Sequence, residues 1–366
     1  MKKVFVILLI SNFYIQASCS KQTYVSSNVT LATEKFISSN MVNKNGILAT
    51  YLKDEASTNP TLAAGREALS ESIGLQLTYL VQKNDRKTFE TYYQSLNKYF
   101  ISEETGIVYW KLEKDGTTNV TTNALVDDWR IADALFKAGE KWNIQKYITT
   151  AKNICNAINT YNKNNGYIVN FYDEQYKKSS DKVSIFFVDP TALNYMSKYN
   201  LIDSETYNLM NSLLKNTPND GVFFSENYNV ITKTYQNESR VNMIEQLYIA
   251  YFLKLAGKDS TSFYSFTKEQ FIKNKMLFGQ YDRATRRPLV KYESNAVYGM
   301  LILYALQMND QKFAKSVYQR MRKFEITDKK SPYYGGYVIK TKSGYNTHIF
   351  DNLFPLLAKQ ELKTIY

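Results

Sequence analysis

Acidic side chains are the residues of this chain with the widest scope for chemistry. His348 is the single histidine, and Cys19 and Cys155 are the only cysteines, so the usual zinc patterns are excluded. No glycine-rich phosphate loop occurs, and no metal or cofactor is expected. A Ser-His-Asp triad would depend on His348 alone, whose apolar neighbours indicate a structural histidine. Carboxylates remain, and a pair of them can perform general acid–base chemistry.

The first acidic segment reads Ser-Glu-Ser-Ile-Gly-Leu-Gln-Leu over residues 70–77. Glu71 stands among apolar residues at the start of a predicted helix, a partly desolvated place that keeps a carboxylic acid protonated near neutral pH. Acids are also favoured in a first helical turn by the helix dipole and by capping. The pattern alone therefore leaves a catalytic and a structural role open for Glu71.

The second acidic segment begins a helix at Asp127 and Asp128. Adjacent helical residues point in different directions. We therefore expect one of the two aspartates to reach a functional cleft, while the other can serve as the helix N-cap. The spacing does not say which of them does so.

The two segments together resemble glycoside hydrolase family 8. Residues 70–77 are similar to the family's Ser-Glu-Gly-x-Gly-Tyr-Gly-Met motif, whose glutamate is the proton donor. Ser70, Glu71 and Gly74 match, while Ser72 replaces the first glycine. Residues 128–142 fit the constrained positions of a second family signature, except that Phe136 replaces an aliphatic residue.

The resemblance departs from the family just before that signature. Leu125 and Val126 occupy the positions of a Ser/Thr-Asp pair, and Asp127 is displaced by one residue. Residues 236–240 lie where some subfamilies have a Tyr-Asp-Ala-x-Arg motif that supplies the catalytic base. Arg240 matches its arginine, but Asn237 stands at the aspartate position, so the base cannot be assigned by matching.

The resemblance implies an inverting, endo-acting glycosidase of the endoglucanase type that cuts a β-linked bacterial exopolysaccharide or β-glucan. Glu71 would be the general acid, and three further acids are candidates for the second catalytic or sugar-binding carboxylate. Sugar-binding candidates are an arginine and two tryptophans, which could equally be helix-start or core residues. The candidates are Asp127, Asp128 and Glu238 for the carboxylate, and Trp110, Trp129 and Arg240 for binding. The alternative is a catalytically weakened polysaccharide-binding or assembly protein on the same scaffold.

Helices must position these residues. Apolar residues spaced by three and four positions predict helices through the chain, separated by short polar loops. The predicted helices are 25–41, 68–82, 86–99, 128–140, 144–161, 189–199, 203–215, 239–256, 262–276, 293–308, 310–325 and 348–361. Short extended pieces are predicted in the loops at 106–112, 166–172, 221–224 and 332–339. No fixed repeat and no Pro- or Gly-rich linker divides residues 20–366. These features predict an all-α chain that forms a single (α/α)6 barrel domain.

The N-terminus reads as a signal for export. Lys2 and Lys3 precede the apolar run 4–10, which is too short to span a bilayer, and small residues lead to Cys19. We expect residues 1–19 to hold the cleaved signal, with Cys19 as the first mature residue if it is lipidated, and lipid anchoring through Cys19 is favoured over free secretion. Cys155 is expected to be a buried thiol.

Charge gives a weaker indication of the partners. The formal net charge of +12 is not concentrated in a basic arm, so nucleic acid is not an expected partner. The basic excess favours residence near an anionic cell envelope or an acidic polymer. The expected partners are a polysaccharide substrate and the cell-envelope surface, and the chain is expected to be a monomer.

Overall fold

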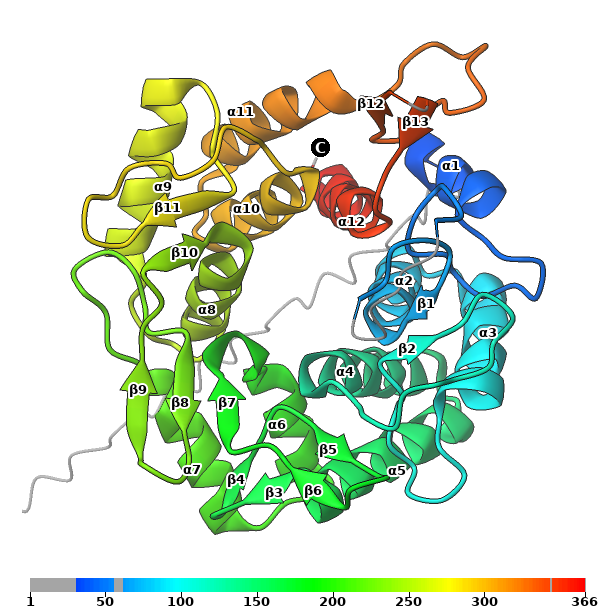
Figure 1. The fold of residues 1–366 in the computed structure, drawn as a ribbon, viewed down its shortest axis with the longest axis vertical. Helices are drawn as coiled ribbons and strands as arrows, with labels where there is room; N and C mark the ends of the chain where they lie inside the picture. Colours follow the sequence, from blue (N-terminus) through cyan, green and yellow to red (C-terminus); the bar gives the residue numbers. More distant parts are fainter. Residues whose placement is uncertain (1–30, 56–61, 343, 366) are drawn as a thin grey trace, which may run out of the picture.

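The structure is a computed structural model that describes residues 31–55, 62–342 and 344–365. Within these ranges twelve α-helices form two concentric rings (Figure 1), six inner and six outer. This arrangement confirms the predicted all-α class and the (α/α)6 barrel. The predicted signal peptide and Cys19 lie outside the described residues.

Consecutive helices alternate between the rings. The inner helices are α2 (Ser70–Lys83), α4 (Leu125–Trp142), α6 (Pro190–Lys198), α8 (Met243–Leu255), α10 (Asn295–Gln307) and α12 (Phe350–Ile365). The outer helices are α1 (Ala32–Asn40), α3 (Arg86–Ser95), α5 (Gln145–Tyr161), α7 (Ser204–Lys215), α9 (Thr261–Asn274) and α11 (Gln311–Met321). Three short turns of other helix types are η1 (Leu96–Phe100), η2 (Ile185–Phe187) and η3 (Arg322–Phe324).

The sequence explains which helices lie inside. Helix α10 is apolar on nearly its whole circumference, because it packs against α8, α11 and α12 at once. Helix α11 is amphipathic and buries one stripe, formed by Phe313, Ala314, Val317 and Met321. Close packing of the inner ring also requires small residues. A Cβ on Gly299 of α10 would lie 2.6 Å from the backbone carbon of Phe354 in α12.

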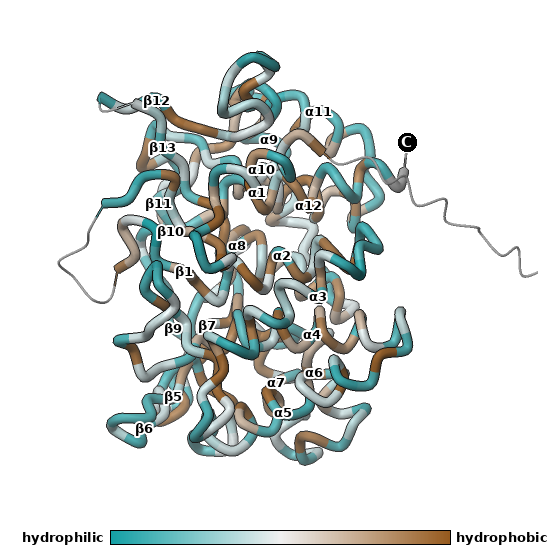
Figure 2. Tube along the Cα trace, turned by 90° about the vertical axis from the view of Figure 1, so that its right-hand side faces the viewer, coloured by the Kyte–Doolittle hydropathy of each residue, from teal (hydrophilic) through white to brown (hydrophobic). Residues whose placement is uncertain are grey.

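Short antiparallel strands gather at one end of the barrel (Figure 2). The two-stranded pairs are β1 (Ala68–Leu69) with β2 (Lys111–Leu112), β3 (Lys163–Asn164) with β4 (Tyr167–Ile168), β5 (Tyr172–Asp173) with β6 (Lys178–Ser179), β10 (Arg240–Asn242) with β11 (Gln280–Asp282), and β12 (Ile339–Thr341) with β13 (Gly344–Asn346). Strands β7 (Lys182–Ser184), β8 (Asn227–Asn229) and β9 (Thr234–Gln236) form a three-stranded sheet. Strand β1 leads directly into α2 and β10 into α8, so these inner helices begin at the strand-bearing end.

The structure corrects several predicted bounds. The predicted helix 239–256 begins only at Met243, because residues 240–242 pair with β11 and the Asn242 side chain caps α8. The predicted extended piece 221–224 contributes only a single bridge, from Phe224 to Asn219. The sheet β7–β8–β9 was not predicted, since strands of three residues are too short to show a period of two. No helix among the described residues is long and apolar enough to cross a membrane.

Candidate active site

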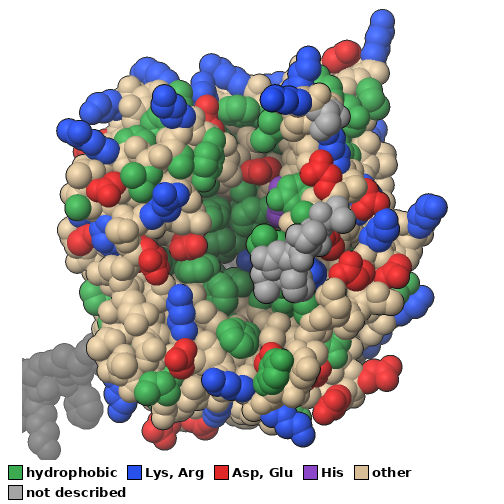
Figure 3. Space-filling view, in the orientation of Figure 1, with side chains coloured by type: hydrophobic (Ala, Val, Ile, Leu, Met, Phe, Trp, Pro, Cys, Tyr) green, Lys and Arg blue, Asp and Glu red, His purple; other side chains and the backbone are tan. Residues whose placement is uncertain are grey.

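A hollow opens at the centre of the strand-bearing end (Figure 3). Apolar side chains line its walls, and charged side chains surround it. The first turns of the inner helices α2 and α4 meet here, because β1 and β2 pair beside them and the Ser70 amide donates to the Trp110 carbonyl over 3.0 Å. The hollow therefore receives whatever side chains the first turns of these helices carry.

Glu71 is the second residue of α2 and is half-buried. Its carboxyl makes no hydrogen bond to the other described residues. Burial raises the pKa of Glu71 to about 8, the negative charge of Asp127 adds to the rise, and Arg130 opposes it. At neutral pH the carboxyl is therefore mostly protonated, which is the state required of a general acid.

A hydrogen-bonded chain joins three inner helices beside Glu71. Asp127 on α4 accepts from the Ser70 hydroxyl at 2.8 Å and from Arg130 Nη1 at 2.6 Å. Arg130 Nη2 donates to the Tyr248 hydroxyl of α8 at 3.0 Å. Both oxygens of Asp127 and both terminal nitrogens of Arg130 are thus engaged, so the charges next to Glu71 have fixed positions.

Gly74 allows this chain to form. It lies one turn after Glu71 on α2, where α2 crosses α4. A Cβ at this position would lie 3.2 Å from Ile131 Cγ1 and 3.3 Å from Arg130 Cδ. The match of Gly74 to the family motif therefore has a local physical reason, the space that the Arg130 side chain needs.

The two adjacent aspartates have separate roles, as their helical positions require. Asp127 lies beside Glu71, whereas Asp128 is fully buried and accepts from Asn123 Nδ2 at 2.5 Å. The same Asn123 accepts from the Tyr172 amide through its Oδ1. Burial raises the pKa of Asp128 well above its usual range. Asp128 therefore joins α4 to the neighbouring loops and does not reach the hollow.

The two predicted tryptophans also separate. Trp110 is partly exposed and lines one recess with Phe171 and Phe187, beside Ala124 at the start of α4. Trp129 is 0% exposed, so its ring belongs to the core and is not available to a sugar. The recess offers aromatic faces, which suit the C–H surfaces of sugar rings.

The structure does not bring Glu238 or Arg240 into the network around Glu71. Both side chains are exposed, Glu238 between β9 and β10, and Arg240 on β10 where it donates to Gln280 at 3.1 Å. Nearby Glu226 is 1% exposed and forms an ion pair with Arg283. That pairing is structural, since it closes the loops around β8 and β11.

Glu245 is an acid that the sequence reasoning missed. It is the third residue of α8, as Asp127 is the third residue of α4, and it is half-buried one turn before Tyr248. Burial raises its pKa to about 7, and the charge of Glu226 adds to this rise. Helix α8 lies opposite α2 in the inner ring (Figure 1). The usable sequence signal was an acid at the same helical position as Asp127.

Metal ligands are not grouped in the described part of the chain, where no cluster of three or more His, Cys, Asp or Glu side chains could hold an ion. His348 packs its ring against Tyr51 at 4.8 Å and accepts from the Phe350 amide. Burial lowers the pKa of His348. These contacts agree with the structural role expected for the single histidine.

Comparisons with known proteins identify the family and the fold. The family model for glycosyl hydrolases family 8 matches residues 1–215. The chain is 35% identical to "Putative lipoprotein YdaJ" of Bacillus subtilis (strain 168), over 98% of this chain and 96% of that protein. Its fold is similar to that of PssZ from Listeria monocytogenes, with 28% identity, a TM-score of 0.71, and 91% and 96% of the two chains covered. A novel alpha-amylase from Clostridium perfringens shares the fold at a TM-score of 0.81 and 23% identity, over 90% and 96% of the two chains.

Proposed function

Because this chain belongs to glycosyl hydrolases family 8, we propose that it is an exported glycosidase that cuts β-glycosidic bonds within a bacterial exopolysaccharide or β-glucan. The observation that carries the proposal is the place of Glu71 in the first turn of α2 beside the Asp127–Arg130 ion pair, where burial raises its pKa to about 8. Export rests on the N-terminal signal pattern and on the name of the Bacillus relative, and Cys19 is the proposed point of lipid anchoring.

Glu71 would protonate the leaving oxygen, and Glu245 is our candidate for the base that activates water on the opposite face of the sugar. An inverting enzyme needs two carboxyl groups about 6.5–9.5 Å apart in the complex, with room for this water. Burial raises the pKa of both carboxyls, to about 8 for Glu71 and to about 7 for Glu245. Glu71 can therefore hold a proton near neutral pH, and Glu245 can exchange one.

Asp127 and Arg130 would hold the charge environment of Glu71 and bind the sugar next to the cleaved bond. Trp110, Phe171 and Phe187 would stack on neighbouring sugar rings, because aromatic faces match their apolar C–H patches. The aromatic recess and the open hollow together fit a long chain better than a small sugar.

The test is release of reducing ends from β-glucans and from the exopolysaccharide of the source cell. We expect Glu71→Gln and Glu245→Gln each to lower the rate by about 10²- to 10⁴-fold, the usual share of general acid–base catalysis. Glu238→Gln is the matched control and should retain activity, because its side chain lies exposed on a loop. Full activity in Glu71→Gln would refute the proposal, and full activity in Glu245→Gln would refute the assignment of the base.

A second candidate function is polysaccharide binding without cleavage. It is favoured by Asn237, which stands in an exposed loop at the position where related enzymes can have their base. Retention of polymer with no new reducing ends, across β-glucans and exopolysaccharide, would support it. Starch belongs in the same panel because of the Clostridium alpha-amylase. Cleavage of starch alone would contradict the proposed β-linkage.

A further inference from the structure

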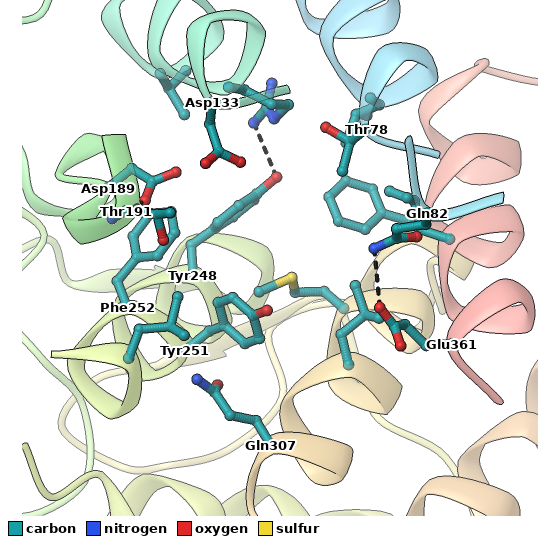
Figure 4. A pocket seen from close by; sticks show the side chains of 18 of the residues that line it. Thr78, Gln82, Asp133, Asp189, Thr191, Tyr248, Tyr251, Phe252, Gln307 and Glu361 are labelled. Atoms are coloured by element: carbon teal, nitrogen blue, oxygen red, sulfur yellow. Dashed lines mark hydrogen bonds between the residues drawn. The ribbon is translucent and has the colours of Figure 1, made fainter. Parts of the chain in front are cut away.

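A second cavity lies inside the inner ring, beyond the Arg130–Tyr248 hydrogen bond as seen from the hollow. Its volume is about 380 Å³, and all six inner helices contribute to its wall (Figure 4). That volume is within the usual range of small-molecule sites, about 300–1,000 Å³. Glu71 and Asp127 do not line it, whereas Thr78 and Gln82, further along α2, do. The cavity therefore shares Arg130 and Tyr248 with the site proposed for the polysaccharide, and it extends from them towards the C-terminal ends of α2 and α12.

The charges that line this cavity do not balance. Three carboxylates face it, Asp133 on α4, Asp189 at the start of α6 and Glu361 on α12. Lys137 pairs with Asp133 at 2.6 Å and its charge also acts on Asp189 and Glu361, while Arg130, the other cation of the wall, pairs with Asp127. Three acidic side chains thus line the cavity with two basic ones. The cavity is thus locally acidic, although the whole chain has a formal net charge of +12.

Hydrogen-bond acceptors are also left over. Asp133 is 7% exposed and points into the cavity in Figure 4, and its Oδ1 has no partner among the described residues. Gln82 donates through Nε2 to Glu361 at 3.1 Å, which fixes its amide so that its Oε1 is the unpartnered atom. The Oε1 of Gln307 has no partner in the described chain either. Buried polar groups are normally paired, so these three acceptors together indicate a missing hydrogen-bond donor.

The rest of the wall is apolar and aromatic. Phe252, Met300 and Leu303 line it, and the Tyr251 ring stands close enough to Asp189, Glu361 and Asp133 for their charges to raise its pKa beyond the rise that burial causes. Aromatic faces attract cations, and the aliphatic side chains suit an alkyl chain.

We propose that this cavity is a second binding site, for a small organic cation with an apolar body, of the alkyl-diammonium class. One ammonium donates to Asp133 and lies between Asp133 and Asp189. The alkyl chain packs on Phe252 and Leu303. The second ammonium reaches Gln82 and Glu361, towards the C-terminal ends of α2 and α12.

The experiment is isothermal titration calorimetry of the purified protein with 1,5-diaminopentane, with glutarate and 1,5-pentanediol as chain-length-matched anionic and neutral controls. We expect saturable binding of the diamine at a stoichiometry of one, a rise in Tm, and no binding of glutarate. Because the protein is strongly basic overall, non-specific attraction of a dication is disfavoured. No heat with the diamine up to millimolar concentration, or equal binding of all three probes, would overturn the proposal.

Two variants locate the binding. Asp133→Asn should weaken diamine binding about tenfold or more, a change of about 1.4 kcal/mol, while Leu303→Trp should fill the cavity and abolish binding. Circular dichroism checks that each variant is folded. If Leu303→Trp does not fold, the result for Asp133→Asn still tests the assignment. Unchanged binding in a folded variant would contradict the assignment. Glu71→Gln should bind the diamine as the parent does, so failure here is separable from failure of the proposed hydrolase activity.

Discussion

Helix α4 carries two ion pairs at two depths of the barrel, Asp127 with Arg130 at the hollow and Asp133 with Lys137 at the inner cavity. Both have a nitrogen–oxygen distance of 2.6 Å. Around the first pair, Ser70 and Tyr248 complete the hydrogen bonds. In the second pair, Lys137 reaches only one oxygen of Asp133 and the other oxygen has no partner in the described chain.

The difference follows from the cation as much as from the surroundings. The planar guanidinium of Arg130 contacts two partners in fixed directions, whereas the ammonium of Lys137 is a single point charge on a flexible stem. The side chain of Lys137 is also 44% exposed, against 11% for Arg130. The Asp127–Arg130 pair, here the upper pair, therefore fixes the charges beside Glu71. The Asp133–Lys137 pair, the lower pair, leaves one carboxylate oxygen available to a ligand.

The largest expected effect is on the pH dependence of hydrolysis. With a pKa of about 8, Glu71 loses its proton above that pH, so the rate should fall about tenfold per pH unit there. Asp127→Asn removes a charge that raises this pKa, and we expect the alkaline limb to move to lower pH. Asp133→Asn is the control at the lower pair and should leave the limb in place. Equal shifts in both variants would remove the distinction between the two pairs.

The next effect is on stability. Arg130→Met leaves the buried Asp127 charge without its partner, which typically costs about 3–5 kcal/mol. Lys137→Met should cost about 1 kcal/mol or less, because an ion pair with one exposed partner contributes little. In addition, the pKa of Asp133 is already raised to about 6, mainly by burial, so this carboxyl can take up a proton. Urea unfolding measures the free energy of unfolding of both variants, provided that the m-value is unchanged. An equal loss of stability in the two variants would contradict the comparison.

A smaller effect, a gain in stability, is expected when Glu71 is replaced by the neutral glutamine. The folded pKa of Glu71 lies above its ordinary value of 4.5, so the folded state binds more protons and stability falls as pH rises from about 4.5 to about 8. Glu71→Gln should therefore be about 1–2 kcal/mol more stable than the parent at pH 9 and much closer to it at pH 4. Thermal unfolding of the parent and of Glu71→Gln across this pH range measures the difference.

The helices and the acid were predictable from sequence because their signals are local. Periodicity places all twelve helices, and the setting of Glu71 indicates a desolvated acid before any distance is known. That only one of two adjacent aspartates faces the hollow also follows from helix geometry. Which of them does so depends on Ser70 and Asn123, which lie on other elements and give no signal at positions 127 and 128.

The candidate residues that lie away from Glu71 could not be told apart from sequence for a different reason. Trp129 and Trp110 have the same side chain, and only the packing of α4 against its neighbours decides that the first is core. Glu238 was chosen because it lies in the segment 236–240, where some subfamilies have a motif that supplies the base. The candidacy of Glu245 depends instead on the closure of the ring, which sets α8 opposite α2. The inner cavity has no sequence signal, because six helices far apart in the chain build it.

The smallest effect should come from Gly74→Ala, which tests how tightly the upper pair is held. Alanine favours a helix over glycine by about 1 kcal/mol, but its Cβ would crowd Ile131 and Arg130 at 3.2 and 3.3 Å. We expect the gain in helix propensity and the cost of crowding nearly to cancel, so that the free energy of unfolding changes little. The displacement of Arg130 should lower the hydrolysis rate a few-fold. Gly139→Ala near the other end of α4 is the matched control. Its Cβ would lie 2.4 Å from Ile148 Cγ1, far from Glu71, so it should lower stability and leave the rate per folded molecule unchanged. If Gly74→Ala instead lowers stability and spares the rate, the position of Arg130 does not control the acid.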